Sequence, residues 1–205
     1  MPPSPRCISS GRFLAQSGNT FSVSFDPDER IRLFVGLRLP DDVVKAVIPW
    51  QHEIFSNRAV HAVPPENLHI TLAFLHSRPA RDVEKIVECL REATSNQREP
   101  LELTVWRYRE TSRVGMVEFH DKDGRASTIE NTLTNLLWER GLYEPERRKW
   151  RAHLTVTRFR DPPKLQPPLP DLGTVSPSEA AVYHSLLRRG GAQYEALETV
   201  RLGGG

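Results

Sequence analysis

Two short motifs in the sequence pair a histidine with a threonine inside an apolar run. The first is Leu68–Leu72 (LHITL) and the second is Ala152–Val156 (AHLTV). Side chains at positions i and i+2 of a β-strand point to the same face, so each histidine would project beside its threonine while the apolar residues face a core. The spacing therefore predicts two strands that present their polar side chains to one shared groove.

Paired histidines are suited to acid–base chemistry. A neutral imidazole can take a proton and an imidazolium can give one, and both forms are accessible near neutral pH. The hydroxyls of Thr71 and Thr155 could donate to the non-bridging oxygens of a phosphate held between the strands. With His69 and His153 as the acid–base pair, the pattern predicts in-line displacement at a phosphodiester, and it requires neither a metal nor a cofactor.

A zinc site is the main chemical alternative, because histidine is a common zinc ligand. Its candidate ligands are His61, His69, His76 and His153. Their spacing matches no metal signature, and neither of the two cysteines is placed to complete a ligand set. A serine or cysteine nucleophile also lacks a supporting motif. We therefore expect no metal site.

Composition describes the class of protein and its compartment. The chain has 205 residues, 38% hydrophobic and 26% charged, which is typical of a globular protein with one sizeable core. Apolar runs fall short of the roughly 18 residues that span a bilayer, and the N-terminal stretch lacks the apolar segment of a secretory signal. Two cysteines suit a reducing compartment. We expect a cytoplasmic protein, without membrane contact and monomeric.

Net charge is only +2, which argues against a general polyanion binder, but the positive residues are unevenly placed. Several of them bracket the second motif: Arg147, Arg148, Lys149, Arg151, Arg158 and Arg160. Such a cluster is either a solvated face or a region that attracts phosphate.

The order strand, helix, His-Thr strand occurs twice, over about 31–75 and 114–159. It predicts an α+β fold of two pseudo-symmetric lobes, each an antiparallel sheet with helices packed outside, and a central cleft across which the motif strands face each other. We expect residues 1–28 to form a disordered extension and 29–205 to form the single bilobal domain.

Local signals place the remaining elements. Asp41 and Asp42 follow Pro40 as a helix start, and Pro49 is expected to kink or shorten that helix. Ser127 and Glu130 have the spacing of a capping box, and Gly141 is a plausible stop for their helix. The other expected elements are a helix over 83–93, strands over 101–108 and 114–119, an extended Pro-rich linker over 162–170, and a hairpin of strands 180–187 and 194–202.

With these motifs in place, the sequence resembles the two-histidine (2H) phosphoesterase superfamily, whose mark is a pair of H-x-[ST]-x motifs. It is most similar to the RNA 2′,3′-cyclic phosphodiesterase branch, also called 2′-5′ RNA ligase-like. The similar segments are Arg32–Val35 (RLFV), Leu39-Pro40, Asn67–Leu75 (NLHITLAFL), His153–Arg158 (HLTVTR) and Leu186–Tyr194 (LLRRGGAQY).

The resemblance implies hydrolysis of a 2′,3′-cyclic phosphate to a 2′-phosphomonoester, with RNA 3′ ends or cyclic nucleotides as substrates. It implies that His69 is the proton donor to the 3′ leaving oxygen, that His153 is the proton acceptor from water, and that Thr71 and Thr155 bind the phosphate. The same geometry could run in reverse as 2′-5′ ligation. A third alternative is an RNA- or nucleotide-binding module that has lost catalysis.

Two further residues are candidates for substrate contacts. Arg158 fits the arginine that follows the family's second motif and would bind phosphate, yet simple alternation places it on the face opposite His153 unless the strand bends. Phe34 could stack on a base or pack under a helix. Trp150 and Tyr183 are expected to be core residues.

Overall fold

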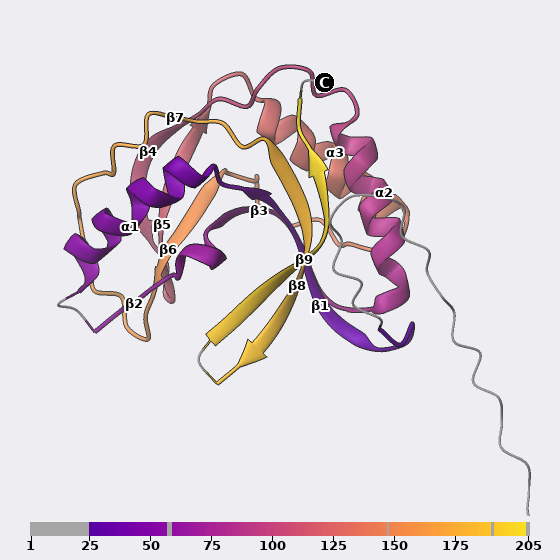
Figure 1. Cartoon of the computed structure of the whole chain (residues 1–205), viewed down its shortest axis with the longest axis horizontal. Helices are drawn as coiled ribbons and strands as arrows, with labels where there is room; N and C mark the ends of the chain where they lie inside the picture. Colours follow the sequence, from indigo (N-terminus) through magenta and orange to yellow (C-terminus); the bar gives the residue numbers. More distant parts are fainter. Residues whose placement is uncertain (1–24, 57–58, 147, 190, 204–205) are drawn as a thin grey trace, which may run out of the picture.

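The structure is a computed structural model that describes residues 25–56, 59–146, 148–189 and 191–203. It confirms an α+β fold in which antiparallel strands form a curled sheet (Figure 1). The helices are α1 (Asp41–Phe55), α2 (Val83–Thr94) and α3 (Arg125–Glu139), with 3₁₀ turns at Pro65–Asn67 and Ala80–Asp82. The strands are β1 (Arg30–Arg38), β2 (His61–Ala62), β3 (His69–Pro79), β4 (Leu103–Glu110), β5 (Val114–Asp121), β6 (His153–Arg158), β7 (Thr174–Val175), β8 (Glu179–Arg188) and β9 (Gly191–Arg201).

The two motif strands are neighbours in one sheet. Strand order is β7-β4-β5-β6-β3-β1-β8-β9, with β2 also paired to β6. β3 meets β6 antiparallel at Ile70 and Leu154, and β2 takes the place beside β6 at Thr157 and Arg158. The expectation that the motif strands face each other across a gap is therefore corrected. Ile70 and Leu154 are both fully buried, and direct pairing is what removes them from water.

The repeated units interlock through their helices. One unit is β1-α1-β3 and the other is β5-α3-β6. Helix α1 contacts β6, and helix α3 contacts β3, so each helix packs on the motif strand of the other unit. Figure 1 shows α1 at one end of the sheet and the packed pair α2 and α3 at the other.

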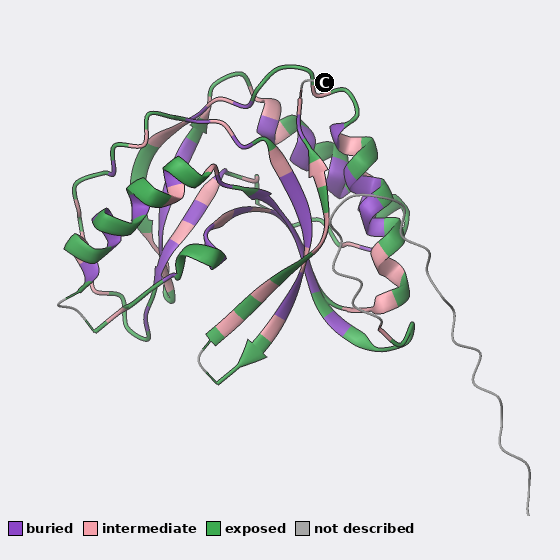
Figure 2. Ribbon diagram, viewed as in Figure 1, coloured by how far each residue is buried: buried purple, intermediate pink, exposed green. Residues whose placement is uncertain are grey.

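Alternation along the motif strands confirms the predicted faces (Figure 2). In β3, Ile70 and Leu72 are buried while His69 and Thr71 are half-buried. In β6, Leu154 and Val156 are buried while His153 and Thr155 are half-buried. The apolar face of each strand lies in the main core, which leaves the polar face free for chemistry.

Helix termini agree only in part with the local signals. Helix α1 runs through Pro49 to Phe55, so the predicted shortening is wrong. Pro49 has no N–H to donate to the Lys45 carbonyl one turn earlier. Both residues are exposed, so water can solvate that carbonyl and the helix continues.

The capping box predicted for α3 is also wrong, because the helix begins at Arg125 and Ser127 lies inside its first turn. The Asp121 carboxylate accepts hydrogen bonds from the N–H and the hydroxyl of Ser127, each at 2.7 Å. Asp121 is therefore the residue that caps this helix. The predicted stop at Gly141 is confirmed by a φ of +69°, with its N–H donating to the Trp138 carbonyl at 2.9 Å.

The packed chain begins slightly earlier than expected. Residues 1–24 of the predicted extension lie outside the described residues. Phe25 packs its ring edge-on against His184, and the Arg81 N–H donates to the Pro27 carbonyl at 3.0 Å. Residues 25–28 are thus attached to the domain. No helix in the described ranges is long and apolar enough to cross a membrane.

Candidate active site on the shared sheet

The register of β3 and β6 brings all four motif residues together. Antiparallel pairing about Ile70 and Leu154 places His69 opposite Thr155 and Thr71 opposite His153. Each histidine thus lies beside the threonine of the other motif. Cross-strand neighbours point to the same face of a sheet, so the predicted groove residues share one surface.

Backbone carbonyls hold both imidazoles in the same way. Nδ1 of His69 lies 2.8 Å from the Asn67 carbonyl, and Nδ1 of His153 lies 2.9 Å from the Arg151 carbonyl. A carbonyl oxygen can only accept, so each Nδ1 carries hydrogen and each Nε2 is left for the groove. In His69 that Nε2 lies 3.1 Å from the Thr71 hydroxyl, which can donate to it. The pair is therefore oriented before any substrate arrives.

Aromatic rings surround His69. The ring centroids of Phe34 and Tyr194 lie 4.7 and 5.2 Å from the imidazole centroid. The pKa of His69 is lowered to about 4, and burial of the ring is the largest cause. The hydrogen bond to the Asn67 carbonyl raises this pKa, whereas the charges of His153 and Arg158 lower it. His69 is thus neutral at pH 7 in the free protein.

Phe34 builds the wall behind His69. Its side chain is 2% exposed and stacks on Tyr183 at a centroid distance of 4.8 Å. The expected base-stacking role does not fit this burial, because the rings of His69, Phe74, Tyr183 and Tyr194 already pack against it. Tyr194, a half-buried ring edge-on to His69, was missed by sequence reasoning, since only the pairing of β8 and β9 brings it there.

A β-bulge resolves the conflict over Arg158. Met116 is opposite Thr155 but Gly115 is opposite Thr157, so Val156 is an extra residue in β6. The bulge interrupts the alternation, and the charge of Arg158 reaches far enough to lower the pKa of His69. The strict alternation that would place Arg158 on the opposite face therefore does not hold, and Arg158 stays a candidate for phosphate binding.

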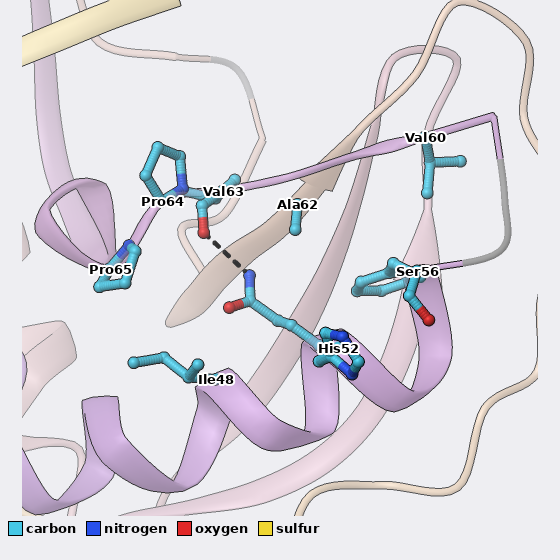
Figure 3. Close-up of a pocket in the computed structure, with 10 residues that line it drawn as sticks. Ile48, His52, Ser56, Val60, Ala62, Val63, Pro64 and Pro65 are labelled. Atoms are coloured by element: carbon cyan, nitrogen blue, oxygen red, sulfur yellow. Dashed lines mark hydrogen bonds between the residues drawn. The ribbon is translucent and has the colours of Figure 1, made fainter.

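Gln51 of α1 fixes this bulge, because its Nε2 donates to the Val156 carbonyl at 2.7 Å and to the Val63 carbonyl at 3.1 Å. The second of these bonds crosses a small hollow of about 350 Å³ between α1 and residues 60–65 (Figure 3). Apolar side chains such as Ile48 and Val60 line most of the hollow. His52 is the histidine among the lining residues, and neither motif histidine lines this hollow.

Gly36 of β1 leaves room for the His69 ring. It is paired with Thr71, and a Cβ there would lie 3.2 Å from the Ile70 carbonyl oxygen and 3.3 Å from Cδ2 of His69. Any side chain would press on the imidazole. A glycine inside an otherwise apolar strand is the signal that could have revealed this position.

A cavity of about 830 Å³ opens beside Thr71 and His153. Its lining includes the cationic residues Arg107, Arg109, Arg148, Lys149 and Arg151 and the acidic residues Glu118, Glu130 and Glu146. The charge cluster expected around the second motif thus contributes to the site.

Glu118 organises the far wall of this cavity. It is 1% exposed and binds Nε of Arg107 at 2.8 Å and Nη1 of Arg109 at 3.0 Å. Burial alone would raise the pKa of the Glu118 carboxyl, but these two guanidinium groups hold it below its usual range. The carboxylate thereby fixes two arginines on the face that carries the histidines.

The zinc alternative finds no ligand set in the described ranges, where no three His, Cys, Asp or Glu side chains gather as metal ligands would. Trp150, expected in the core, is half-buried at the edge of the cavity and donates from Nε1 to the Thr71 carbonyl at 2.9 Å.

Comparison with known proteins finds relatives in sequence and in fold. The family model for LigT-like phosphoesterases matches residues 37–109, which contain the first motif. A curated relative, the RNA 2′,3′-cyclic phosphodiesterase of Archaeoglobus fulgidus, is 41% identical over 64 residues, which span 31% of this chain and 36% of that protein. The match thus covers about a third of the relative's length.

Solved structures match over most of the chain. Escherichia coli LigT complexed with 3′-AMP is 23% identical with a TM-score of 0.72, covering 86% of this chain and 100% of that one. A protein of Thermus thermophilus is 25% identical with a TM-score of 0.69, covering 85% and 99%. The chain is thus similar in sequence to LigT-like phosphoesterases over residues 37–109, and it shares the fold of the solved LigT structures over most of its length.

Proposed function

We propose that this protein hydrolyses 2′,3′-cyclic phosphate ends of RNA to 2′-phosphomonoesters by paired-histidine catalysis that needs no metal. The observation that carries the proposal is the pairing of the two His-Thr strands, which places His69 and His153 on one face with both Nε2 atoms unclaimed by backbone. The name of the curated relative and the LigT complex with 3′-AMP support a nucleotide substrate. We expect the protein to act as a cytoplasmic monomer.

The proposed reaction is a single in-line displacement. Water loses a proton to Nε2 of His153 and attacks phosphorus, the bond from phosphorus to O3′ breaks, and O3′ takes a proton from Nε2 of His69. Thr71, Thr155 and Arg158 would hold the non-bridging oxygens, where negative charge develops. The ring of His69 is neutral in the free protein, so the donor role requires that bound phosphate raise its pKa.

A titration tests that requirement. In the free protein the His69 ring signal in an NMR titration is expected to move with a midpoint near pH 4. Saturating 2′-AMP is expected to shift this midpoint upward by at least one pH unit, because the phosphate places negative charge beside the ring. The signal of His52, exposed on α1, is the internal control. A midpoint that stays near 4 with ligand bound would reverse the two roles and make His69 the acceptor.

Product analysis tests the function itself. The protein is incubated in EDTA with an RNA oligonucleotide that ends in a 2′,3′-cyclic phosphate, together with a second oligonucleotide bearing a 5′-hydroxyl. We expect the 2′-phosphomonoester as the main product. A joined 2′-5′ product would favour ligation, binding without turnover would favour an inactive module, and turnover that EDTA abolishes would contradict the metal-independent mechanism.

A further inference from the structure

We propose that the cavity beside His153 is a second nucleotide subsite, which takes the nucleotide adjoining the cyclic end of a single RNA strand. Arg107 and Arg151, which line the cavity, would bind its phosphate, and Trp106, which contacts both arginines outside the lining, would stack on its base. The inference rests on the proposed function and names its substrate as a strand of at least two nucleotides rather than a free cyclic mononucleotide.

Trp106 is presented by a bulge in β4. Val105 is opposite Phe119 and Arg107 is opposite Glu118, which leaves Trp106 as an extra residue in its strand. Its side chain is 38% exposed, although a large apolar ring is normally removed from water. Bulges re-aim side chains and are frequent beside active sites. The ring of His120 lies 4.9 Å from the indole by centroids, tilted at 38°, and the part of the indole that stays exposed is the surface on which a base could stack.

Two guanidinium groups flank the indole. Cζ of Arg107 lies 4.1 Å and Cζ of Arg151 lies 5.6 Å from the centroid of the Trp106 ring. Cation–π contact holds such groups in place while their N–H donors stay available for phosphate oxygens. An aromatic face beside positive charge is the combination by which proteins bind single-stranded nucleic acid.

This cluster is continuous with the acid–base site. Arg107 is opposite Glu118 on β5, and Glu118 is opposite His153 on β6, so the three residues form one row across the sheet. Two strand spacings place Arg107 roughly 10 Å from His153 at the backbone. Arg151 is closer still, because its carbonyl accepts the Nδ1–H of His153. A strand held at the histidines can therefore reach the cluster.

Charge in the cavity exceeds what one phosphate needs. A cyclic mononucleotide carries a single negative charge, which the chemistry places at the histidines. Arg107 and Arg109 are shared with buried Glu118, but Arg148, Lys149 and Arg151 also line the cavity. Arg148 is in turn paired with Glu146 at 2.8 Å, so Lys149 and Arg151 are the cations of this set left for a further phosphate. Each further nucleotide of a strand adds one phosphate, and cationic side chains that contact it release counterions. The cavity of about 830 Å³ is also large enough for a nucleotide.

The test compares substrates that differ only in length. Steady-state kcat/KM is measured for a 2′,3′-cyclic mononucleotide and for a dinucleotide that ends in the same cyclic phosphate. Stacking of one base predicts an advantage of roughly tenfold for the dinucleotide. Trp106→Ala is expected to abolish that ratio, Trp106→Phe is expected to keep most of it, and Trp138→Ala is the control because Trp138 is 59% exposed on α3.

Two outcomes would overturn the subsite. One is equal kcat/KM for both substrates in the unmodified protein, and the other is a Trp106→Ala variant that loses the same factor on both. If the protein turns over neither substrate, the proposed function is wrong. The subsite can then still be tested by measuring how tightly the protein binds one and two nucleotides. In that case 3′-phosphorylated ApA should bind about tenfold more tightly than 3′-AMP in the unmodified protein and equally in Trp106→Ala.

Discussion

Replacing either histidine of the pair with alanine is expected to lower kcat on a 2′,3′-cyclic nucleotide by roughly 10²- to 10⁴-fold, the range typical of a positioned acid or base. In the proposed displacement, His69 and His153 would act on opposite sides of the same phosphorus. Loss of either one stops that concerted proton transfer. The double variant is therefore expected to be little slower than the worse single variant, because the two groups act as a unit.

Single-turnover rates with saturating substrate measure this effect without interference from product release. His52→Ala is the matched control, since His52 is exposed on α1 and lies outside the groove. Thermal melts of all variants show whether the fold is kept. A His69→Ala or His153→Ala variant that retains half the original rate would contradict paired catalysis.

Glu130→Gln is expected to stabilise the protein at pH 8 but not at pH 4. Glu130 is 8% exposed on α3, and burial, helped by the charge of Glu146, raises the pKa of its carboxyl from 4.5 to about 7. A raised pKa means that the folded state holds the proton more tightly than the unfolded state. The stability tied to that proton is fully present below pH 4.5 and lost as the pH rises through 7. The buried carboxylate then costs roughly 3 kcal/mol, and glutamine avoids this cost.

Urea unfolding at the two pH values measures the difference directly. Glu139→Gln serves as the control, because Glu139 is exposed at the end of the same helix. The free energy of unfolding of Glu130→Gln should exceed that of the unmodified protein at pH 8, and the two should converge at pH 4. An equal difference at both pH values would show that Glu130 acts through packing and not through ionisation.

Sequence alone could predict which faces of the two motif strands are buried, but not how the strands are placed relative to each other. Alternation is a local property, so the half-exposed faces of β3 and β6 followed from the apolar residues beside His69 and His153. Register between distant strands is not local. Nothing in either motif shows that Ile70 pairs with Leu154, or that pairing of β8 and β9 brings Tyr194 to His69.

Bulges were the other source of error. The extra residue at Val156 is stabilised by Gln51, which is far away in the sequence, and so the side of the strand that carries Arg158 could not be read from β6 itself. The extra residue at Trp106 is likewise defined only against β5. The prediction of the α3 cap failed for a similar reason. The capping residue is Asp121, which lies before the turn that precedes the helix and accepts hydrogen bonds from the N–H groups of Ala126 and Ser127.

The exchange of helices between the two units has a consequence for how the chain is built. Because α1 packs on β6 and α3 packs on β3, each motif strand is covered by the helix of the other unit. Each unit therefore depends on the other for the helix that packs on its motif strand, and the two strands meet at Ile70 and Leu154. The two histidines nevertheless have different surroundings. His69 lies among aromatic rings, whereas His153 lines a cavity with several cationic residues.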